Sequence, residues 1–370
     1  MADQFTKTVK GGSDPFMDRA LDLAERGRGT TSPNPMVGAV VVGDDGTVVG
    51  QGFHEQAGGP HAEVRALDEA GTSARGASLY CTLEPCSHVG RTGPCVERIA
   101  AAGITRVIAS TQDPNPLVAG RGFQFLRDRG IEVVVGPGRD RALRLNRAYF
   151  TFIAERRPFV IAKAATSIDN CVSPHVGARG QISSPESLRH AHGIRAEVDA
   201  IGVGSETVLV DDPLLTVRQV TRRRPLVRVV FDRRLRVSPS ARLFSTLDAG
   251  PVIIVTTPEA AAEHPARARA LEAAGAQLEP IAGNLRVALQ RLGERQLMSL
   301  LLEGGPTLQR AAAAENVIDA VQLYVAPDAL GTTGVRWLEP DDLRIASLAD
   351  RRVLPCGPDV FLEGYVHGID

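Results

Sequence analysis

The sequence predicts an α/β protein of two domains, and three observations support this. At 370 residues, the chain is longer than one typical hydrophobic core accommodates. Apolar strands and amphipathic helices alternate along most of it, as in layered α/β folds. Pro158, in the run Arg-Arg-Pro at 156–158, ends a helix that begins near Arg139, because proline disfavours helical backbone in the residue before it. We therefore expect one domain over residues 13–156 and a second over 157–370.

The first half begins with a helix and a hairpin. Asp14 precedes Pro15, which suits the first position of a helix. A β-branched run at 36–42 and a second apolar run at 47–53 flank the turn Gly-Asp-Asp-Gly, which predicts a β-hairpin. Beyond it we expect helices over 61–70, 95–102 and 122–129, with strands over 77–81, 104–110 and 131–135.

A second alternating series follows the boundary. We expect buried strands over 159–165, 200–203, 225–231, 252–256, 299–302 and 321–326, with helices that include 258–274 and 306–314. The segment from Thr207 to Arg218 is predicted to be a helix, a stop at Asp-Asp-Pro, and a loop that ends in a cation. The sequence Glu303-Gly-Gly-Pro-Thr307 lies between a strand and a helix. Free amides at such a helix start suit a phosphate group.

Composition excludes several classes of protein. A net charge of −1 without a block of like charge does not indicate a nucleic-acid partner. The start of the chain has no apolar stretch behind its lysines, and runs such as 37–42 are far too short to span a membrane. Five cysteines do not form a disulfide framework in a chain of this size. A reducing cytoplasm fits them better and leaves their thiols free to bind metal.

One segment carries metal-binding chemistry. His61-Ala-Glu63 is followed by Pro-Cys86 and, eight residues later, by Pro-Cys95. One imidazole and two thiolates leave the fourth tetrahedral position of a zinc ion open to water, as catalytic zinc requires. Each of these residues taken alone is commonly structural. Together and in this order, they match the H-x-E…P-C…C pattern of zinc deaminases. The cysteine spacing is wider than the two residues found in nucleic-acid editing enzymes.

Glu63 is the candidate proton shuttle of this site. A carboxylate two residues from a metal ligand does not share its helix face. Glu63 therefore reaches the metal-bound water only if the pair stands where a helix begins. The prolines before Cys86 and Cys95 likewise predict that each thiolate lies near a helix start, where the helix dipole favours an anion. Cys81 is expected to be a core strand residue instead.

The chain resembles a known family over nearly its whole length from residue 14. In the first half, the resemblance is carried by Asn34-Pro-Met-Val-Gly38, His61-Ala-Glu63, Glu84-Pro-Cys-Ser-His88 with Cys95, Asp113-Pro-Asn-Pro116 and Val118-Ala-Gly-Arg-Gly122. In the second half, it is carried by 163–169, 207–218, 303–308 and 357–360. The family is the bifunctional riboflavin-biosynthesis diaminohydroxyphosphoribosylaminopyrimidine deaminase and 5-amino-6-(5-phosphoribosylamino)uracil reductase.

The resemblance implies a cytidine-deaminase-like three-layer domain followed by a dihydrofolate-reductase-like α/β domain. It implies Zn²⁺ and NADPH as cofactors and a small phosphoribosyl-pyrimidine as substrate. Deamination of 2,5-diamino-6-(phosphoribosylamino)pyrimidin-4-one would precede reduction of the ribose to a ribityl chain. Asn34, His54, His88 and Arg91 match positions that hold the base and the ribose phosphate in the deaminase pocket. A turn at Asn34 and a solvated Arg91 are the structural alternatives.

The same resemblance assigns the reductase pocket. Its substrate positions fall on Arg179, Arg195, Leu215, Arg218 and Glu303, and its cofactor positions on Ala165, Gln181, Thr207, Asp211, Gly305, Pro306 and Thr307. The sequence departs from the family pattern at Asn170-Cys171, where glycine and a basic residue are usual, and at Gln181, where tryptophan is usual. Asparagine tolerates positive φ, so the first change is mild. Loss of the aromatic ring removes a large contact surface.

Two alternatives to the bifunctional enzyme stay open at this point. The chain could be a deaminase whose second domain has become an oligomer-forming scaffold in a specialised pathway. It could also be a zinc-stabilised binding module, although Glu63 argues against a closed structural site. A homo-oligomer is expected in either enzymatic interpretation. A nucleic-acid deaminase is disfavoured by charge and by cysteine spacing.

Overall fold

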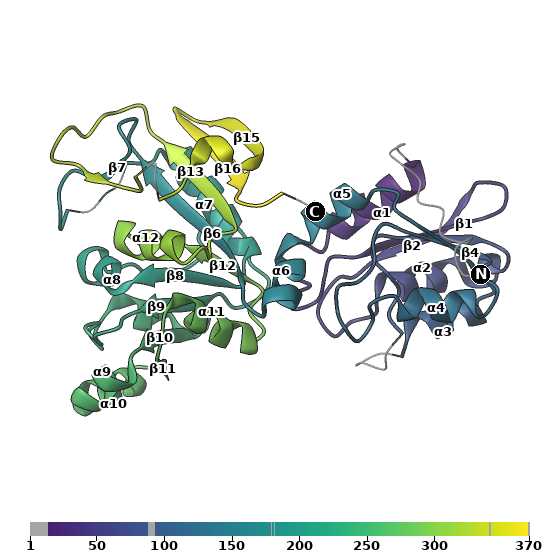
Figure 1. Cartoon of the computed structure of the whole chain (residues 1–370), viewed down its shortest axis with the longest axis horizontal. Helices are drawn as coiled ribbons and strands as arrows, with labels where there is room; N and C mark the ends of the chain where they lie inside the picture. Colours follow the sequence, from purple (N-terminus) through teal and green to yellow (C-terminus); the bar gives the residue numbers. More distant parts are fainter. Residues whose placement is uncertain (1–13, 88–92, 179, 181, 340–341, 369–370) are drawn as a thin grey trace. The chain divides into compact units, whose positions relative to one another are not determined.

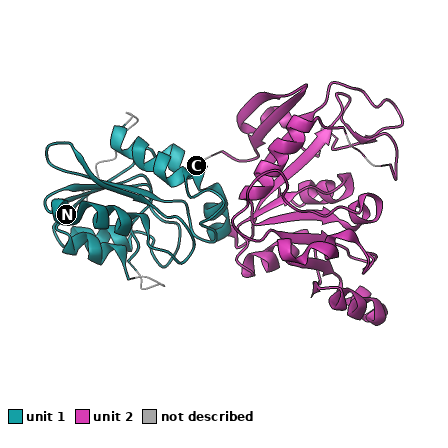
Figure 2. Cartoon of the chain, turned by 180° about the vertical axis from the view of Figure 1, so that it is seen from behind, with its two compact units in different colours: residues 1–154, 369 teal, residues 155–368, 370 magenta. Residues whose placement is uncertain are grey.

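The computed structural model describes residues 14–87, 93–178, 180, 182–339 and 342–368. The described residues form two compact units, one within residues 1–154 and the other within 155–368 (Figure 2). Each unit contains its own sheet and its own hydrophobic core. No helix in the described part of the chain combines the length and the apolar character that crossing a membrane requires.

The described residues of the first unit form a five-stranded sheet in the order β2-β1-β3-β4-β5 (Figure 1). Its strands are β1 (Gly38–Val42), β2 (Val48–Phe53), β3 (Ser78–Cys81), β4 (Arg106–Ala109) and β5 (Glu132–Val135). β1 runs antiparallel to β2 and β3, whereas β3, β4 and β5 are parallel. The carboxyl ends of β3 and β4 therefore meet at one edge of the sheet.

Helices cover both faces of this sheet. The helices are α1 (Pro15–Glu25), α2 (Ala62–Ala70), α3 (Cys95–Ala101), α4 (Arg121–Arg127), α5 (Arg139–Leu145) and α6 (Arg147–Glu155), with a 3₁₀ turn η1 (Gly71–Ala74). Buried residues of α2, α3 and α4 pack on one face, and those of α1 and α5 pack on the other (Figure 1). The predicted three-layer domain is confirmed.

The single helix predicted from Arg139 to residue 156 is wrong, because Asn146 breaks it into α5 and α6. Asn146 has a φ of −106°, and its side chain pairs with the backbone of Met36. Its Oδ1 accepts from the N–H of Met36 at 2.8 Å, and its Nδ2 donates to the Met36 carbonyl at 2.8 Å. These bonds also explain why the strand predicted from residue 36 begins at Gly38.

The described residues of the second unit form a nine-stranded sheet in the order β11-β10-β9-β8-β12-β6-β13-β16-β15. The strands are β6 (Phe159–Thr166), β8 (Ala200–Gly204), β9 (Val227–Phe231), β10 (Val252–Thr256), β11 (Ala276–Pro280), β12 (Ser299–Leu302), β13 (Ala320–Val325), β15 (Ala349–Cys356) and β16 (Asp359–Tyr365). All pairs from β11 to β13 are parallel, and β16 and β15 close the sheet with antiparallel pairing. A small ladder joins β7 (Cys171–Ser173) to β14 (Val335–Arg336).

This second sheet also has helices on both faces. They are α7 (Pro185–Glu197), α8 (Ser205–Asp211), α9 (Pro258–Glu263), α10 (Pro265–Ala273), α11 (Leu285–Glu294) and α12 (Pro306–Ala314), with 3₁₀ turns η2 (Arg242–Ala249) and η3 (Ile345–Ser347). One core includes α11 and α12, and the other includes α8, α9 and α10. The helix predicted over 258–274 is wrong in one respect. It is interrupted at His264, because Pro265 cannot donate a helical hydrogen bond and instead starts α10.

Candidate zinc centre and reductase site

Three predicted metal ligands converge at one end of the first unit. His61 caps the start of α2, Cys95 is the first residue of α3, and Cys86 lies in irregular backbone after β3. Their ligand atoms all lie within 4.8 Å of one another. His61 Nδ1 is 3.2 Å from Cys95 Sγ and 3.5 Å from Cys86 Sγ. The backbone N–H of Cys95 donates to Cys86 Sγ at 3.3 Å, so both sulfurs lie at the start of α3.

This donor set fits a zinc ion. With Zn–S bonds of about 2.3 Å and a Zn–N bond of about 2.0 Å, tetrahedral angles place nitrogen and sulfur about 3.5 Å apart. The two nitrogen–sulfur separations are close to this value. Among the described residues, the cluster holds one imidazole and two thiols. Such a set leaves one tetrahedral position for a reacting molecule, as in catalytic rather than structural zinc sites.

Electrostatics at this cluster favour an anionic sulfur. The pKa of Cys86 falls to about 4, first because the Cys95 thiol hydrogen-bonds to it and then because His61 lies beside it. The same contact raises the pKa of Cys95, so that without metal one thiolate and one thiol share a proton. The pKa of His61 is raised, mainly by its hydrogen bond with Cys86. Cys86 therefore already offers a thiolate, and a metal ion displaces the protons of His61 and Cys95 when it binds.

Glu63 stands in the first turn of α2, two residues after His61, and its side chain is buried. Residues two apart can face the same site only where a helix begins, and this condition is met because His61 is the N-cap residue of α2. Burial raises the pKa of Glu63 to about 7, and its carboxyl also contacts the Cys95 side chain. A carboxyl group with this pKa takes up and releases a proton near neutral pH.

Two predicted pocket residues lie beside the metal cluster. Asn34 Nδ2 is 3.0 Å from His54 Nε2, and His54 Nδ1 is 3.2 Å from the Pro60 carbonyl. These contacts define a neutral His54 that donates to Pro60 and accepts from Asn34, and burial lowers its pKa. The His54 ring meets the His61 ring edge-on with centroids 5.5 Å apart. Asn34 is thus oriented by a residue that packs against a metal ligand. The predicted residues His88 and Arg91 lie outside the described residues.

The predicted substrate residues of the second unit gather around Glu303, which follows β12. Arg195, from α7, binds the Glu303 carboxylate through two hydrogen bonds of 2.6 and 2.7 Å. Lys163 Nζ, from β6, lies 3.6 Å from the same carboxylate. Burial alone would raise the pKa of Glu303, but Arg195 and Lys163 outweigh it and lower the pKa to about 2. Glu303 is therefore a permanent anion between two cations.

The loop after α8 completes this group, which we call the Glu303 cluster (Lys163, His192, Arg195, Arg218 and Glu303). Arg195 also donates to the Thr216 carbonyl at 3.3 Å, and the backbone N–H of Arg218 donates to His192 Nδ1 at 3.2 Å. Leu215, another predicted substrate residue, is buried in this loop with a left-handed φ of 54°. Three cations against one carboxylate leave the cluster positive, which suits a phosphorylated substrate.

Sequence reasoning missed Lys163 as a site residue, although the sequence held a signal. From residue 11 to the end of the chain, Lys163 is the only lysine, and every other basic side chain apart from histidine is arginine. A compact ammonium group at one position of such an arginine-rich chain indicates a site that a planar guanidinium does not fit. The structure places it against Glu303 and over the Tyr324 ring, 5.4 Å from the ring centroid.

The predicted cofactor residues lie at the carboxyl ends of neighbouring strands. Gly305 caps α12, Pro306 and Thr307 begin it, and Thr207 stands in the first turn of α8. A Cβ atom on Gly305 would lie 4.0 Å from Thr207 Oγ1, so the two helix starts adjoin. Asp211 ends α8, and Ala165 lies near the end of β6. Arg179 and Gln181 lie outside the described residues.

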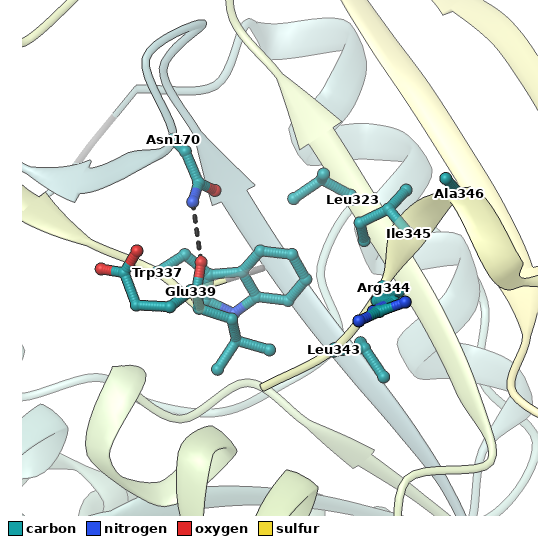
Figure 3. A pocket seen from close by; sticks show the side chains of 9 residues that line it. Asn170, Leu323, Trp337, Glu339, Leu343, Arg344, Ile345 and Ala346 are labelled. Atoms are coloured by element: carbon teal, nitrogen blue, oxygen red, sulfur yellow. Dashed lines mark hydrogen bonds between the residues drawn. The ribbon is translucent and has the colours of Figure 1, made fainter. Parts of the chain in front are cut away.

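A separate cavity of about 540 Å³ is lined in part by Asn170, one of the residues at which the sequence departs from the family pattern (Figure 3). Leu323, Trp337, Leu338, Leu343 and Ile345 form most of its apolar lining. Asn170 has a φ of 64°, so asparagine occupies the left-handed backbone where glycine is usual, as expected. Its side chain donates to the Leu338 carbonyl at 2.9 Å. The lining includes no member of the Glu303 cluster.

The pKa of His192 gives a testable pH dependence. Burial, helped by Arg195 and Arg218, lowers this pKa to about 4, whereas the ordinary value is 6.5. The unfolded chain therefore binds the proton first, and stability is lost as the pH falls from 6.5 towards 4. We expect His192→Asn, which keeps an acceptor for the Arg218 N–H, to lose less stability over this range. Thermal unfolding at both pH values measures this, and equal losses in the two proteins would contradict it.

Together, the folds and the two sites define a zinc-dependent deaminase domain followed by a reductase domain. The model of the cytidine and deoxycytidylate deaminase zinc-binding region matches residues 13–111, and that of the RibD C-terminal domain matches residues 158–362. The chain belongs to the RibD family of riboflavin biosynthesis proteins, as the resemblance predicted. It is an enzyme with deaminase and reductase domains, and this supports the bifunctional interpretation over the deaminase-only one. Zinc and NADPH are the cofactors of the family, as predicted.

Relatives match along most of the chain. The riboflavin biosynthesis protein RibD of Aquifex aeolicus is 42% identical over 331 residues, which cover 88% of this chain and 91% of the relative. The Escherichia coli protein of the same name is 41% identical over a region that covers 86% of this chain and 88% of the Escherichia coli protein. The solved structure of Acinetobacter baumannii RibD has a TM-score of 0.83 at 34% identity. The match covers 95% of this chain and 98% of the Acinetobacter baumannii chain.

A fourth relative carries a more specific name. The structure of a diaminohydroxyphosphoribosylaminopyrimidine deaminase/5-amino-6-(5-phosphoribosylamino)uracil reductase from Thermotoga maritima has a TM-score of 0.80 at 32% identity. The match covers 95% of this chain and 97% of the Thermotoga maritima chain. The likeness therefore extends across both units.

Proposed function

We propose that the first unit deaminates 2,5-diamino-6-(phosphoribosylamino)pyrimidin-4-one by hydrolysis and that the second reduces the ribose of the product to a ribityl chain. The substrates are those in the name of the Thermotoga maritima relative. The observation that carries the proposal is the convergence of His61, Cys86 and Cys95 beside a buried carboxyl group. The deaminase domain is taken as residues 13–156 and the reductase domain as 157–370.

In the deaminase, His61, Cys86 and Cys95 would hold the zinc ion. When bound, zinc supplies Lewis-acid activation that makes water nucleophilic at neutral pH. Glu63 accepts one proton from the attacking water and passes it to the ring nitrogen as the new C–O bond forms at the carbon bearing the amine. It then carries the remaining hydroxyl proton to the amine, so that the C–N bond breaks, ammonia leaves and a carbonyl group remains. The Glu63 pKa of about 7 suits both transfers. Asn34, held by His54, offers its amide to the pyrimidine edge, and His88 and Arg91 are proposed to hold the rest of the substrate.

In the reductase, the Glu303 cluster would bind the substrate. Arg218 and Arg195 supply positive charge for the ribose phosphate, while Lys163 and Glu303 offer a donor and an acceptor. Leu215 and Arg179 are proposed to complete this pocket.

NADPH would lie beside the Glu303 cluster. When bound, it supplies the reducing equivalents. The backbone N–H groups of Gly305 and Thr307 at the start of α12 would bind its phosphates, because these N–H groups have no helical partner and Pro306 between them has no N–H. Ala165, Gln181, Thr207 and Asp211 are proposed to line the remainder of the cofactor site.

The partners and location follow from the chemistry. The substrate is a small phosphorylated molecule, and a net charge of −1 gives no support to a nucleic-acid partner. Each of the five cysteines is a free thiol, which is compatible with a reducing cytoplasm as the location. A homo-oligomer is also proposed, to be tested by sedimentation.

A coupled assay tests the proposed function. The purified zinc-loaded chain is given the phosphoribosyl-pyrimidine substrate with and without NADPH. We expect one ammonia per substrate in both cases, and one NADPH oxidised per substrate when NADPH is present. Ammonia release without NADPH oxidation would remove the reductase half of the proposal. Absence of ammonia release would remove the deaminase half.

A further inference from the structure

Glu84, two residues before the metal ligand Cys86, has an unusual set of contacts. Its side chain is 3% exposed, and its carboxylate accepts four backbone N–H groups from the segment between β4 and α4 and the start of α4. Oε1 accepts from Gly122 at 2.9 Å and Phe123 at 3.3 Å, and Oε2 accepts from Gly120 at 2.9 Å and Asp113 at 3.2 Å. In the described part of the chain, no basic side chain pairs with this carboxylate.

The position of Cys86 depends on contacts of this kind, because no regular element carries it. β3 ends at Cys81, and the described residues from there to the start of α3 at Cys95 are irregular. Backbone bonds hold the part around residues 84–86: Glu84 N–H donates to the Thr111 carbonyl at 3.0 Å, and Val96 N–H donates to the Cys86 carbonyl at 3.3 Å. The Glu84 carboxylate adds four hydrogen bonds to the segment after β4 and the start of α4.

Close packing at Gly122, one of the four donors, supports this. A Cβ atom on Gly122 would lie 2.1 Å from the Pro85 carbonyl oxygen and 3.1 Å from Glu84 Oε1. Only glycine allows the start of α4 to approach the backbone between Glu84 and Cys86 so closely. The carboxylate and the glycine therefore fix the same short segment together, one by hydrogen bonds and the other by close backbone packing.

A carboxylate is the only side chain of this length that satisfies the four donors. Each of its two oxygens accepts two bonds. Glutamine offers one oxygen, and its NH₂ group would face two of the N–H groups. Buried N–H groups left without an acceptor carry a free-energy cost, and the segment would shift to satisfy them with water. Cys86 would move with it.

We propose that Glu84 is a positioning residue for the zinc ion and sets the location of Cys86 Sγ by clamping residues 84–86 to residues 113–123. This inference rests on the proposed zinc centre and extends it to a residue that touches neither zinc nor substrate. Glu84 acts on the metal only through the backbone that carries the ligand. Its removal therefore lowers the affinity for zinc while all three donor side chains remain.

The test measures zinc release from the full-length zinc-loaded chain to the chelator 4-(2-pyridylazo)resorcinol. Glu84→Gln is expected to release zinc about 10- to 100-fold faster than wild type, the range found when groups behind metal ligands are changed. The control is Glu97→Gln, which removes the same charge from an exposed residue of α3, two positions after Cys95. Its release rate is expected to match wild type.

A second measurement separates positioning from simple destabilisation. The thermal midpoint of each protein is recorded with zinc and after zinc is stripped. If Glu84 positions the ligand, zinc raises the thermal midpoint less in Glu84→Gln than in wild type. A metal ion that binds the folded chain more weakly stabilises it less. A purely structural role predicts equal zinc-induced shifts from a lower starting midpoint, and that result would overturn the proposal.

Gly122→Ala tests the same contact from the other segment and serves if Glu84→Gln does not fold. It is expected to speed zinc release as well, since its Cβ displaces the Pro85 carbonyl. Release as slow as wild type from a folded Glu84→Gln or Gly122→Ala protein would overturn this inference alone. A wild-type chain that holds no zinc would overturn the proposed deaminase site and this inference with it.

Discussion

Glu63→Gln is expected to abolish ammonia release while one zinc ion stays bound to each chain. The substitution keeps the shape of the buried side chain but removes its ability to carry a proton. Positioned proton transfer contributes about 10²- to 10⁴-fold to catalysis, and we expect a loss in this range. Ammonia is measured with the pyrimidine substrate, and zinc is measured by elemental analysis of the same sample.

The reductase half supplies an internal control for this variant. NADPH oxidation with the deaminated substrate should proceed at the wild-type rate, because Glu63 belongs to the other unit. The exposed Glu97→Gln should retain both activities. If Glu63→Gln released ammonia at more than about a tenth of the wild-type rate, Glu63 would not be the proton carrier.

Glu303→Gln is expected to have the largest effect in the second unit. It leaves Arg195 and Lys163 in a buried site without their counter-charge. Removing one partner of a buried ion pair typically costs about 3–5 kcal/mol in stability. We expect reductase activity to fall at least about 100-fold, because the cations that would hold the substrate lose their alignment. NADPH oxidation and urea unfolding measure the two effects.

Glu272→Gln is the matched control for this change. Glu272 is an exposed residue of α10, so the same loss of charge should leave reductase activity and stability unchanged. Ammonia release should be unaffected in both variants. A Glu303→Gln protein with wild-type stability and NADPH oxidation would show that the Glu303 cluster is not the reductase site.

The metal centre could be predicted from the sequence because its chemistry is local. His61 and Glu63 are two residues apart, and each cysteine is marked by the proline before it. Glu84 could not be predicted, because its partners lie 29 to 39 residues further along the chain. Lys163 could have been found from its isolation in an arginine-rich sequence, but its partner Glu303 follows 140 residues later.

Errors in the predicted fold have a similar origin. The break at Asn146 depends on Met36, which lies 110 residues earlier, and local helix preference gives no sign of it. β15 escaped prediction because nearly all of its residues are exposed at the edge of the sheet, so its sequence lacks apolar alternation. The buried strands of both sheets were predictable, since continuous apolar runs are typical of strands covered on both faces.

X-ray absorption at the zinc edge tests the central claim most directly. For the wild-type chain, we predict one zinc with two sulfur ligands at about 2.3 Å, one nitrogen at about 2.0 Å and one light atom from solvent. A spectrum with one sulfur ligand instead of two in Cys86→Ser would identify Cys86 as a zinc ligand. A zinc bound by four protein side chains, or an unchanged spectrum in Cys86→Ser, would contradict the catalytic site described for His61, Cys86 and Cys95.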